Sequence, residues 1–420
     1  MFSFIHAADV HLDSPLQGLS RYDEAPADAI RGATRRAFER LVDLAVEEHV
    51  AFVLLAGDLL DGEWRDHQTG IFLNKQFGIL ERNNIRVFVV AGNHDANSRI
   101  SKALQPPRNV KYMSTKRPES ALLDDLGVVV HGQGFKMQKT EDNLAREFPK
   151  AELGKFNIGL LHTSLNGREG HDTYAPCSLD DLKSKGYDYW ALGHVHEREV
   201  VCRDPLVVFS GCTQGRHARE TGAKGCTLVK VDDGRVVKFD PVNLDVVRWE
   251  QVEVDASGME DEVELNDKVR AAMRAAVDTH EELLMALRIV VGGATRLHRP
   301  LHAYFERWRQ QVRSLGAEIA NDRVWVEKVV LKTHGQKSLE EAAALSESIA
   351  GLLASVTAQP TTVDKVPGLD KVVAELKAKL PPAFDAGEGG FDPASAEVMA
   401  EVIDEAKALL LSRLLTEVKP

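Results

Sequence analysis

The chain has 420 residues, of which 44% are hydrophobic and 28% charged, and its formal net charge is −12. This length suffices for two or three domains, and the negative charge argues against a generally basic protein that coats nucleic acid. No apolar run is long enough to span a bilayer, and the amino terminus lacks the basic and apolar pattern of a cleavable leader, so we expect a cytoplasmic protein without membrane contact.

Strands and helices are predicted to alternate in the first hundred residues, and each strand ends in polar side chains. The apolar runs 2–8, 51–56 and 87–90 are typical of buried strands, and helical periodicity covers about 26–48 and 64–82 between them. Since open α/β sheets place their sites at the carboxyl ends of strands, the polar residues there are expected to converge. An ordinary turn remains the alternative for any single strand end, because turns also use Asp, Asn and Gly.

Two later apolar runs, 156–161 and 187–192, also end in possible metal ligands, and antiparallel strands are expected from about 227 to 250. The complete set of candidate ligands is Asp9, His11, Asp58, Asn93, His162, His194 and His196. Imidazole and carboxylate ligands without thiolate suit Mn²⁺, Fe²⁺ or Zn²⁺. The set is too large for one tetrahedral ion, and it predicts two ions that share a bridging carboxylate, about 3.5–4 Å apart.

Together these residues resemble the motif set of the calcineurin-like metallophosphoesterases. The motifs occur in order across about half of the chain, as Asp9-x-His11, Gly57-Asp58, Gly92-Asn93-His94-Asp95, His162 and Gly193-His194-x-His196. The segments 6–15 and 214–222 are also similar to the SbcD-like branch of DNA repair nucleases, and in particular to its YhaO-like exonucleases.

The resemblance implies a role for each of these residues. Asp58 would bridge two ions, one also held by Asp9, His11 and His196, the other also held by Asn93, His162 and His194. A water would attack phosphorus in line, without a covalent nucleophile. His94 would stabilise the transition state or protonate the leaving oxygen, with Asp95 orienting it. Arg216 and His217 could contact a substrate phosphate, with a structural loop as the alternative.

The expected fold class is α/β. The resemblance implies an αββα sandwich of two packed mixed sheets flanked by helices, with a small βαβαβ capping domain and a helical carboxyl-terminal region. We expect the metallophosphoesterase (nuclease) domain over residues 1–245 and the capping and DNA-binding domain over 246–334. A helical region over 335–380, a linker over 381–392 and a partner-docking helix over 393–420 would follow.

Three functions stay open at this point. The preferred hypothesis is a DNA exonuclease or endonuclease that uses two divalent ions, expected to be Mn²⁺, to hydrolyse phosphodiester bonds at DNA ends in repair. By the same resemblance, an SMC-like coiled-coil ATPase would bind the last helix, which could instead fold back on the chain or form a homodimer contact. A small-molecule metallophosphatase or phosphodiesterase would use the same site chemistry. A binding subunit with a structural metal site is the third hypothesis.

Overall fold

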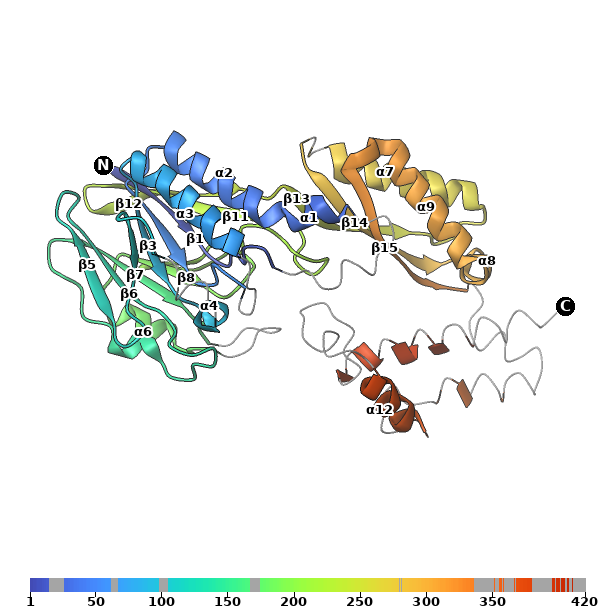
Figure 1. Cartoon of the computed structure of the whole chain (residues 1–420). Helices are drawn as coiled ribbons and strands as arrows, with labels where there is room; N and C mark the ends of the chain where they lie inside the picture. Colours follow the sequence, from blue (N-terminus) through green and yellow to red (C-terminus); the bar gives the residue numbers. More distant parts are fainter. Residues whose placement is uncertain are drawn as a thin grey trace. The chain divides into compact units, whose positions relative to one another are not determined.

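The computed structural model describes residues 1–335 except 15–25, 62–66, 98–104, 167–173, 279 and 281. Beyond residue 335 it describes the helix α12 (Leu369–Lys379) and short stretches between residues 351 and 410. The expected linker 381–392 and most of the expected helices in 335–368 and 393–420 therefore lie outside the described residues. The chain divides into two compact units (Figure 1), of which the second begins at Trp249 and also takes in His217–Arg219.

The first unit is built on two mixed sheets. One sheet has the order β12-β11-β1-β2-β3-β4, in which β1 to β4 are parallel and β11 and β12 pair antiparallel. Its strands are β1 (Phe2–Ala7), β2 (Phe52–Ala56), β3 (Arg86–Val90), β4 (Val110–Tyr112), β11 (Gly225–Asp232) and β12 (Arg235–Asn243).

The second sheet has the order β5-β6-β7-β8-β10-β9, with parallel pairing from β6 to β10 and antiparallel pairs at both edges. Its strands are β5 (Glu119–Leu123), β6 (Val128–Gln133), β7 (Phe156–His162), β8 (Tyr189–Gly193), β9 (Glu199–Arg203) and β10 (Leu206–Phe209). The expected αββα sandwich of two mixed sheets is confirmed.

Aromatic rings fill the space between the two sheets. Phe4 of β1 and Phe52 of β2 stack with their ring centroids 5.0 Å apart, and Tyr189 of β8 meets Phe4 edge-on at 5.2 Å. The next residues along the strands, Ile5 and Val53, belong to the core under the helices of the first sheet. Strands covered on both faces need apolar residues at every position, which explains the continuous runs in the sequence.

Helices cover the outer face of each sheet and complete the layers (Figure 1). The first sheet is covered by α2 (Ala33–Glu47), which follows the short α1 (Ala27–Arg31), and by α3 (His67–Arg82). The second sheet is covered by α6 (Leu179–Lys183) and the 3₁₀ helix η2 (Leu144–Glu147). The short helix α4 (Asn93–Asn97) starts directly after β3 with the residues that carry the ligand motif.

The second unit contains the expected βαβαβ arrangement. Its three-stranded sheet has the order β13-β14-β15, and β14 and β15 are parallel. The helices pack through a core that contains the buried Trp308. The elements are β13 (Val247–Asp255), α7 (Glu262–Asp278), β14 (Leu284–Ala294), α8 (His298–Ala303), α9 (Phe305–Ala320), η3 (Asn321–Arg323) and β15 (Val324–His334). None of the helices described in either unit is long and apolar enough to cross a membrane.

Candidate functional site

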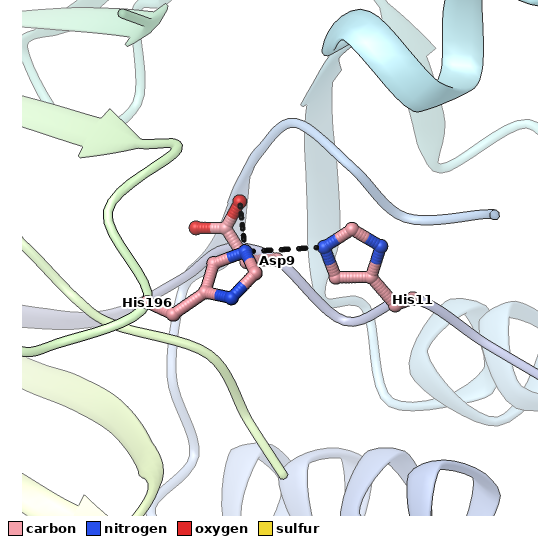
Figure 2. A group of neighbouring side chains, drawn as sticks. All are labelled: Asp9, His11 and His196. Carbon is pink, nitrogen blue, oxygen red and sulfur yellow. Dashed lines mark hydrogen bonds and ion pairs between the residues drawn. The ribbon is translucent and has the colours of Figure 1, made fainter. Parts of the chain in front are cut away.

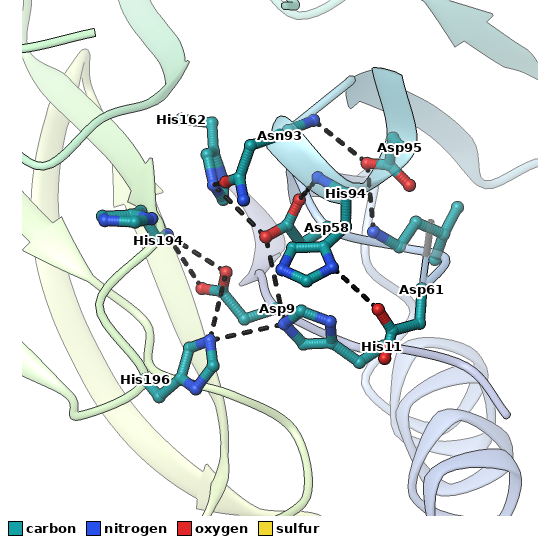
Figure 3. Close-up of polar contacts among 12 residues, drawn as sticks. Asp9, His11, Asp58, Asp61, Asn93, His94, Asp95, His162, His194 and His196 are labelled. Atoms are coloured by element: carbon teal, nitrogen blue, oxygen red, sulfur yellow. Dashed lines mark hydrogen bonds and ion pairs between the residues drawn. The ribbon is translucent and has the colours of Figure 1, made fainter. Parts of the chain in front are cut away.

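The predicted ligands all follow strands of the first unit, and Figure 3 shows them gathered at one place in the fold. The strands β1, β2 and β3 of one sheet and β7 and β8 of the other supply them. Asp9, His11, Asp58 and His194 have positive φ angles of 50°, 45°, 50° and 106°. A non-glycine residue in such a conformation costs about 1–3 kcal/mol and persists only where the surrounding structure enforces it, often at functional sites.

One group of donor atoms comes from Asp9, His11 and His196 (Figure 2), and these atoms lie within 4.8 Å of one another. The Nε2 atoms of His11 and His196 are 3.3 Å apart, and Nε2 of His196 is 3.9 Å from Oδ1 of Asp9. Burial holds the pKa of His11 well below its usual range, so its ring is neutral near pH 7. Its Nδ1 is buried and has no hydrogen-bond partner among the residues that the structure describes.

A second group is formed by Asp9, Asp58 and His162. His162 donates its Nδ1–H to the carbonyl oxygen of Ala56 at 2.9 Å, which leaves Nε2 as the ring nitrogen that can ligate a metal. That Nε2 lies 3.0 Å from Oδ1 of Asn93 and 3.5 Å from Oδ2 of Asp58. Three atoms with lone pairs that face one another in a buried place are suited to ligate a divalent cation. The residues present therefore fit metal ions.

Asp58 lies between the two sides of the site. Its Oδ2 is 3.5 Å from Nε2 of His162 and 3.9 Å from Nε2 of His11, and its side chain is buried. This is the position that a bridging carboxylate needs. Within the described residues, the ring of His194 is in none of the close groups of donor atoms. It packs edge-on against His162 at 5.3 Å, and its backbone N–H donates to Asp9 at 3.0 Å.

Asp95 was expected to orient His94, and the structure instead pairs the His94 ring with another carboxylate. His94 pairs through Nδ1 with Oδ1 of Asp61 at 2.7 Å (Figure 3). The Asp95 carboxylate instead accepts backbone N–H groups at 2.8–3.1 Å and thereby holds the loop after Asp58 in place; these donors are Leu59, Leu60 and Gly92. The sequence analysis did not single out Asp61. Its position three residues after Asp58, in the same loop, is the feature that could have indicated a role in the site.

The pKa of His94 reflects its acidic surroundings. Burial alone lowers this pKa, but the hydrogen bond to Asp61 and the charges of Asp58 and Asp61 outweigh it and raise the pKa to about 9. The ring can therefore hold a proton near pH 7 and donate it. His94 also shares a group of close donor atoms with His11 and Asp58, so the geometry alone permits a ligand role as well.

Two glycines let the ligand-bearing loops approach each other. A Cβ atom at Gly92 would overlap with Oδ1 of Asp58, and one at Gly193 would overlap with the carbonyl oxygen of Ala56. Any side chain at these positions would push the loops apart, which gives the glycines of the Gly-Asn-His and Gly-His-x-His motifs a steric reason.

Arg216, expected as a phosphate contact, is buried and lies against two carboxylates. Its guanidinium is 3.3 Å from Oε1 of Glu220 and 3.8 Å from Oδ2 of Asp61. The other expected contact, His217, belongs to the second unit, where its Nδ1 accepts the backbone N–H of Arg219. Glu220 also accepts the Nδ1–H of His196 at 2.6 Å, a role that the sequence did not reveal.

Comparisons with known proteins give two family matches. Residues 2–198 match the model of the family described as calcineurin-like phosphoesterase, and residues 249–334 match that of the middle domain of metallophosphoesterase YhaO. The first unit therefore carries a calcineurin-like phosphoesterase domain, and the chain has YhaO-like homologues, as the motifs predicted.

Individual relatives include an uncharacterized metallophosphoesterase YhaO of Bacillus subtilis, which is 39% identical over 61% of this chain and 63% of its own length. The DNA double-strand break repair proteins Mre11 of Sulfurisphaera tokodaii and Methanopyrus kandleri are 24% and 26% identical. Their matches cover 69% and 63% of this chain and 73% and 62% of those proteins. The chain thus spans less than two thirds of the Bacillus and Methanopyrus relatives.

Among solved structures, a dimetal phosphatase from Danio rerio aligns with a TM-score of 0.34 at 11% identity, over 55% of this chain and 93% of that one. A score of this size supports no argument about the present chain.

Proposed function

We propose that this chain is a two-metal DNA nuclease that hydrolyses phosphodiester bonds at DNA ends during repair. The observation that carries the proposal is the position of Asp58 between two buried donor groups, 3.5 Å from His162 and 3.9 Å from His11. The phosphoesterase domain supports the reaction class, and the relatives called DNA double-strand break repair proteins support DNA as the substrate.

In this proposal two ions would be held by Asp58 together with ligands from the two sides of the site. Asp9, His11 and His196 would hold the first ion, and Asn93, His162 and His194 would hold the second. When bound, the two ions acidify a water molecule and neutralise phosphate charge. Mn²⁺ is the proposed ion, and the same imidazole and carboxylate donors also accept Fe²⁺ or Zn²⁺.

His94 supplies the proton in this mechanism. Asp61 holds its Nδ1, so Nε2 is the nitrogen left to face a leaving oxygen. The raised pKa keeps the ring protonated near pH 7, and transfer of that proton to the departing oxygen prevents a free alkoxide from forming. Asp95 acts one step further back, by holding the backbone that carries Asp58.

The remaining parts of the chain are proposed to bind DNA and a partner protein. Residues 1–245 would be the nuclease domain and 246–334 a capping domain that binds DNA, which the separate unit from Trp249 and the match over 249–334 support. Residues 335–380 would be a helical region and 381–392 a linker to a docking helix, 393–420, for an SMC-like coiled-coil ATPase. A cytoplasmic location stays a prediction, which cell fractionation tests.

One assay tests the reaction. The protein is incubated with Mn²⁺ and linear single-stranded, double-stranded or hairpin DNA, with Asp58→Asn as the control for contaminating nucleases. The proposal predicts metal-dependent release of nucleotides that the variant does not show. Turnover of p-nitrophenyl phosphate alone would instead indicate a small-molecule phosphatase, and no hydrolysis of either substrate would indicate a binding subunit.

A second experiment tests the docking helix. Truncation after Leu380 is expected to preserve Mn²⁺-dependent activity on short single-stranded DNA and to abolish association with the ATPase. The apolar spacing of Val398, Met399, Val402 and Ile403 in the sequence is the reason for this expectation. Association that survives truncation would contradict the docking role, and a truncated protein that does not fold would indicate that the helix packs on its own chain.

A further inference from the structure

A chain of charged contacts joins His196 to His94. His196 donates its Nδ1–H to Oε1 of Glu220 at 2.6 Å, and Oε2 of Glu220 accepts the backbone N–H of Arg216 at 2.6 Å. The Arg216 guanidinium donates to Oε1 of Glu220 at 3.3 Å and lies 3.8 Å from Oδ2 of Asp61. Asp61 completes the path by pairing with Nδ1 of His94 at 2.7 Å. The path therefore connects a candidate metal ligand, His196, with the candidate proton donor, His94.

Burial makes these contacts strong. Arg216 is 9% exposed and Glu220 is 6% exposed. Burial of a guanidinium is strongly unfavourable unless carboxylates compensate its charge. Two carboxylates lie within 4 Å of the Arg216 guanidinium. Two carboxylates and one guanidinium leave the trio with a single net negative charge. This charge is attractive to divalent cations, whereas an unpaired buried arginine would repel them.

We propose that Arg216 is a positioning residue that clamps Glu220 and Asp61 and thereby sets the imidazoles of His196 and His94. This inference rests on the roles of these two histidines in the proposed function. Glu220 keeps the proton of His196 on Nδ1 and so leaves Nε2 as the ligating atom. Asp61 likewise holds Nδ1 of His94 and leaves its Nε2 to face the leaving oxygen. One rigid guanidinium that contacts both carboxylates holds both rings at once.

The clamp is not symmetric. Asp61 has a second anchor, because its Oδ2 accepts the hydroxyl of Ser14 at 2.7 Å. Its contact with Arg216 is also the longer of the two, 3.8 Å against 3.3 Å. Loss of the guanidinium should therefore loosen His196 more than His94.

The test compares Arg216→Met, which keeps an unbranched apolar side chain but not the charge, with Arg216→Lys, which keeps the charge but not the planar guanidinium. Arg248→Met is the matched control, since Arg248 is a buried arginine of the same unit that pairs with Asp245 at 2.8 Å, and Asp245 belongs to none of the groups of close donor atoms in the described residues. Calorimetric titration gives the affinity and number of Mn²⁺ ions per chain. Nitrogen-15 NMR of the histidine rings, recorded without metal, reports the protonation and hydrogen bonding of each ring nitrogen.

Arg216→Met is expected to weaken the binding of one Mn²⁺ by about 10–100-fold, the usual effect of losing a group that orients a ligand. It should change the ring signals of His196 more than those of His94, and Arg216→Lys should restore only part of the affinity. If Arg216→Met does not fold, Glu220→Gln keeps the shape of the side chain, removes its charge and should give the same change at His196.

Other results would overturn the clamp. Wild-type Mn²⁺ affinity and ring signals in Arg216→Met, together with a raised KM for DNA, would make Arg216 a substrate contact. An equal loss of Mn²⁺ affinity in Arg248→Met would show general loosening of the domain. A wild-type protein that cleaves no DNA would refute the proposed function alone, because the titration and the ring signals do not depend on hydrolysis.

Discussion

Gly92 is a position where one added methyl group should disable the site. Its Cβ would overlap with Oδ1 of Asp58 and lie 2.7 Å from the Asp58 backbone nitrogen, a distance that real Cβ contacts essentially never show. Gly92 does not have a positive φ, so alanine meets no conformational penalty of its own. The expected effect of Gly92→Ala is therefore displacement of Asp58.

The size of the effect follows from what Asp58 touches. Its Oδ2 lies 3.5 Å from His162 and 3.9 Å from His11, so a shift disturbs both donor groups. We expect the metal affinity to fall by about 10–100-fold or more, since this is the loss that follows removal of an outer-shell group. The corresponding loss of binding free energy is roughly 1.4–2.7 kcal/mol. Overpacking should also lower the free energy of unfolding by about 1–3 kcal/mol.

Calorimetric titration with Mn²⁺ measures the first effect and denaturant unfolding the second. Gly78→Ala in α3 is the control, because its Cβ would meet only the flexible end of Arg82 at 3.7 Å. Alanine in a helix interior should raise the free energy of unfolding by roughly 0.5–1 kcal/mol and leave metal binding unchanged. Two Mn²⁺ ions bound to Gly92→Ala with wild-type affinity would refute the bridging position of Asp58.

Three further predictions concern single side chains. His94→Ala should reduce hydrolysis by about 10²–10⁴-fold and retain both ions, whereas loss of an ion in metal analysis would make His94 a ligand. Asp58→Asn should lose more metal than His11→Ala, because a bridging carboxylate compensates two cations; equal metal content in the two variants would argue against bridging. Burial outweighs the hydrogen bond to the Leu192 carbonyl and lowers the pKa of His6 to about 3. The neutral form of His6 therefore stabilises the fold above pH 6.5, the ordinary pKa of histidine, and this stabilisation is lost as the pH falls toward 3. Denaturant unfolding at pH 7 and pH 5 measures this loss, which should be smaller in His6→Gln; an identical loss in that variant would contradict the role of His6.

The strands and the candidate ligands at their ends were predictable from the sequence. Buried parallel strands are apolar at every position, so polar residues at their carboxyl ends stand out without any knowledge of how the strands pair. Asp9, Asp58 and His162 were singled out in this way, and the structure brings their side chains into one group of close donor atoms. The division into a sandwich and a smaller βαβαβ unit was also predictable, because the motif set and the repeated strand and helix patterns reveal both.

The contacts that orient these ligands were decided only by the tertiary structure. Asp95 follows His94 directly, but adjacent residues of a helix point in different directions, and α4 turns the Asp95 carboxylate toward the backbone after Asp58. Asp61 reaches His94 from another loop. Arg216 contacts Asp61 although the two are far apart in the sequence. Because such pairs depend on how loops from different strands pack, no local pattern could have predicted them.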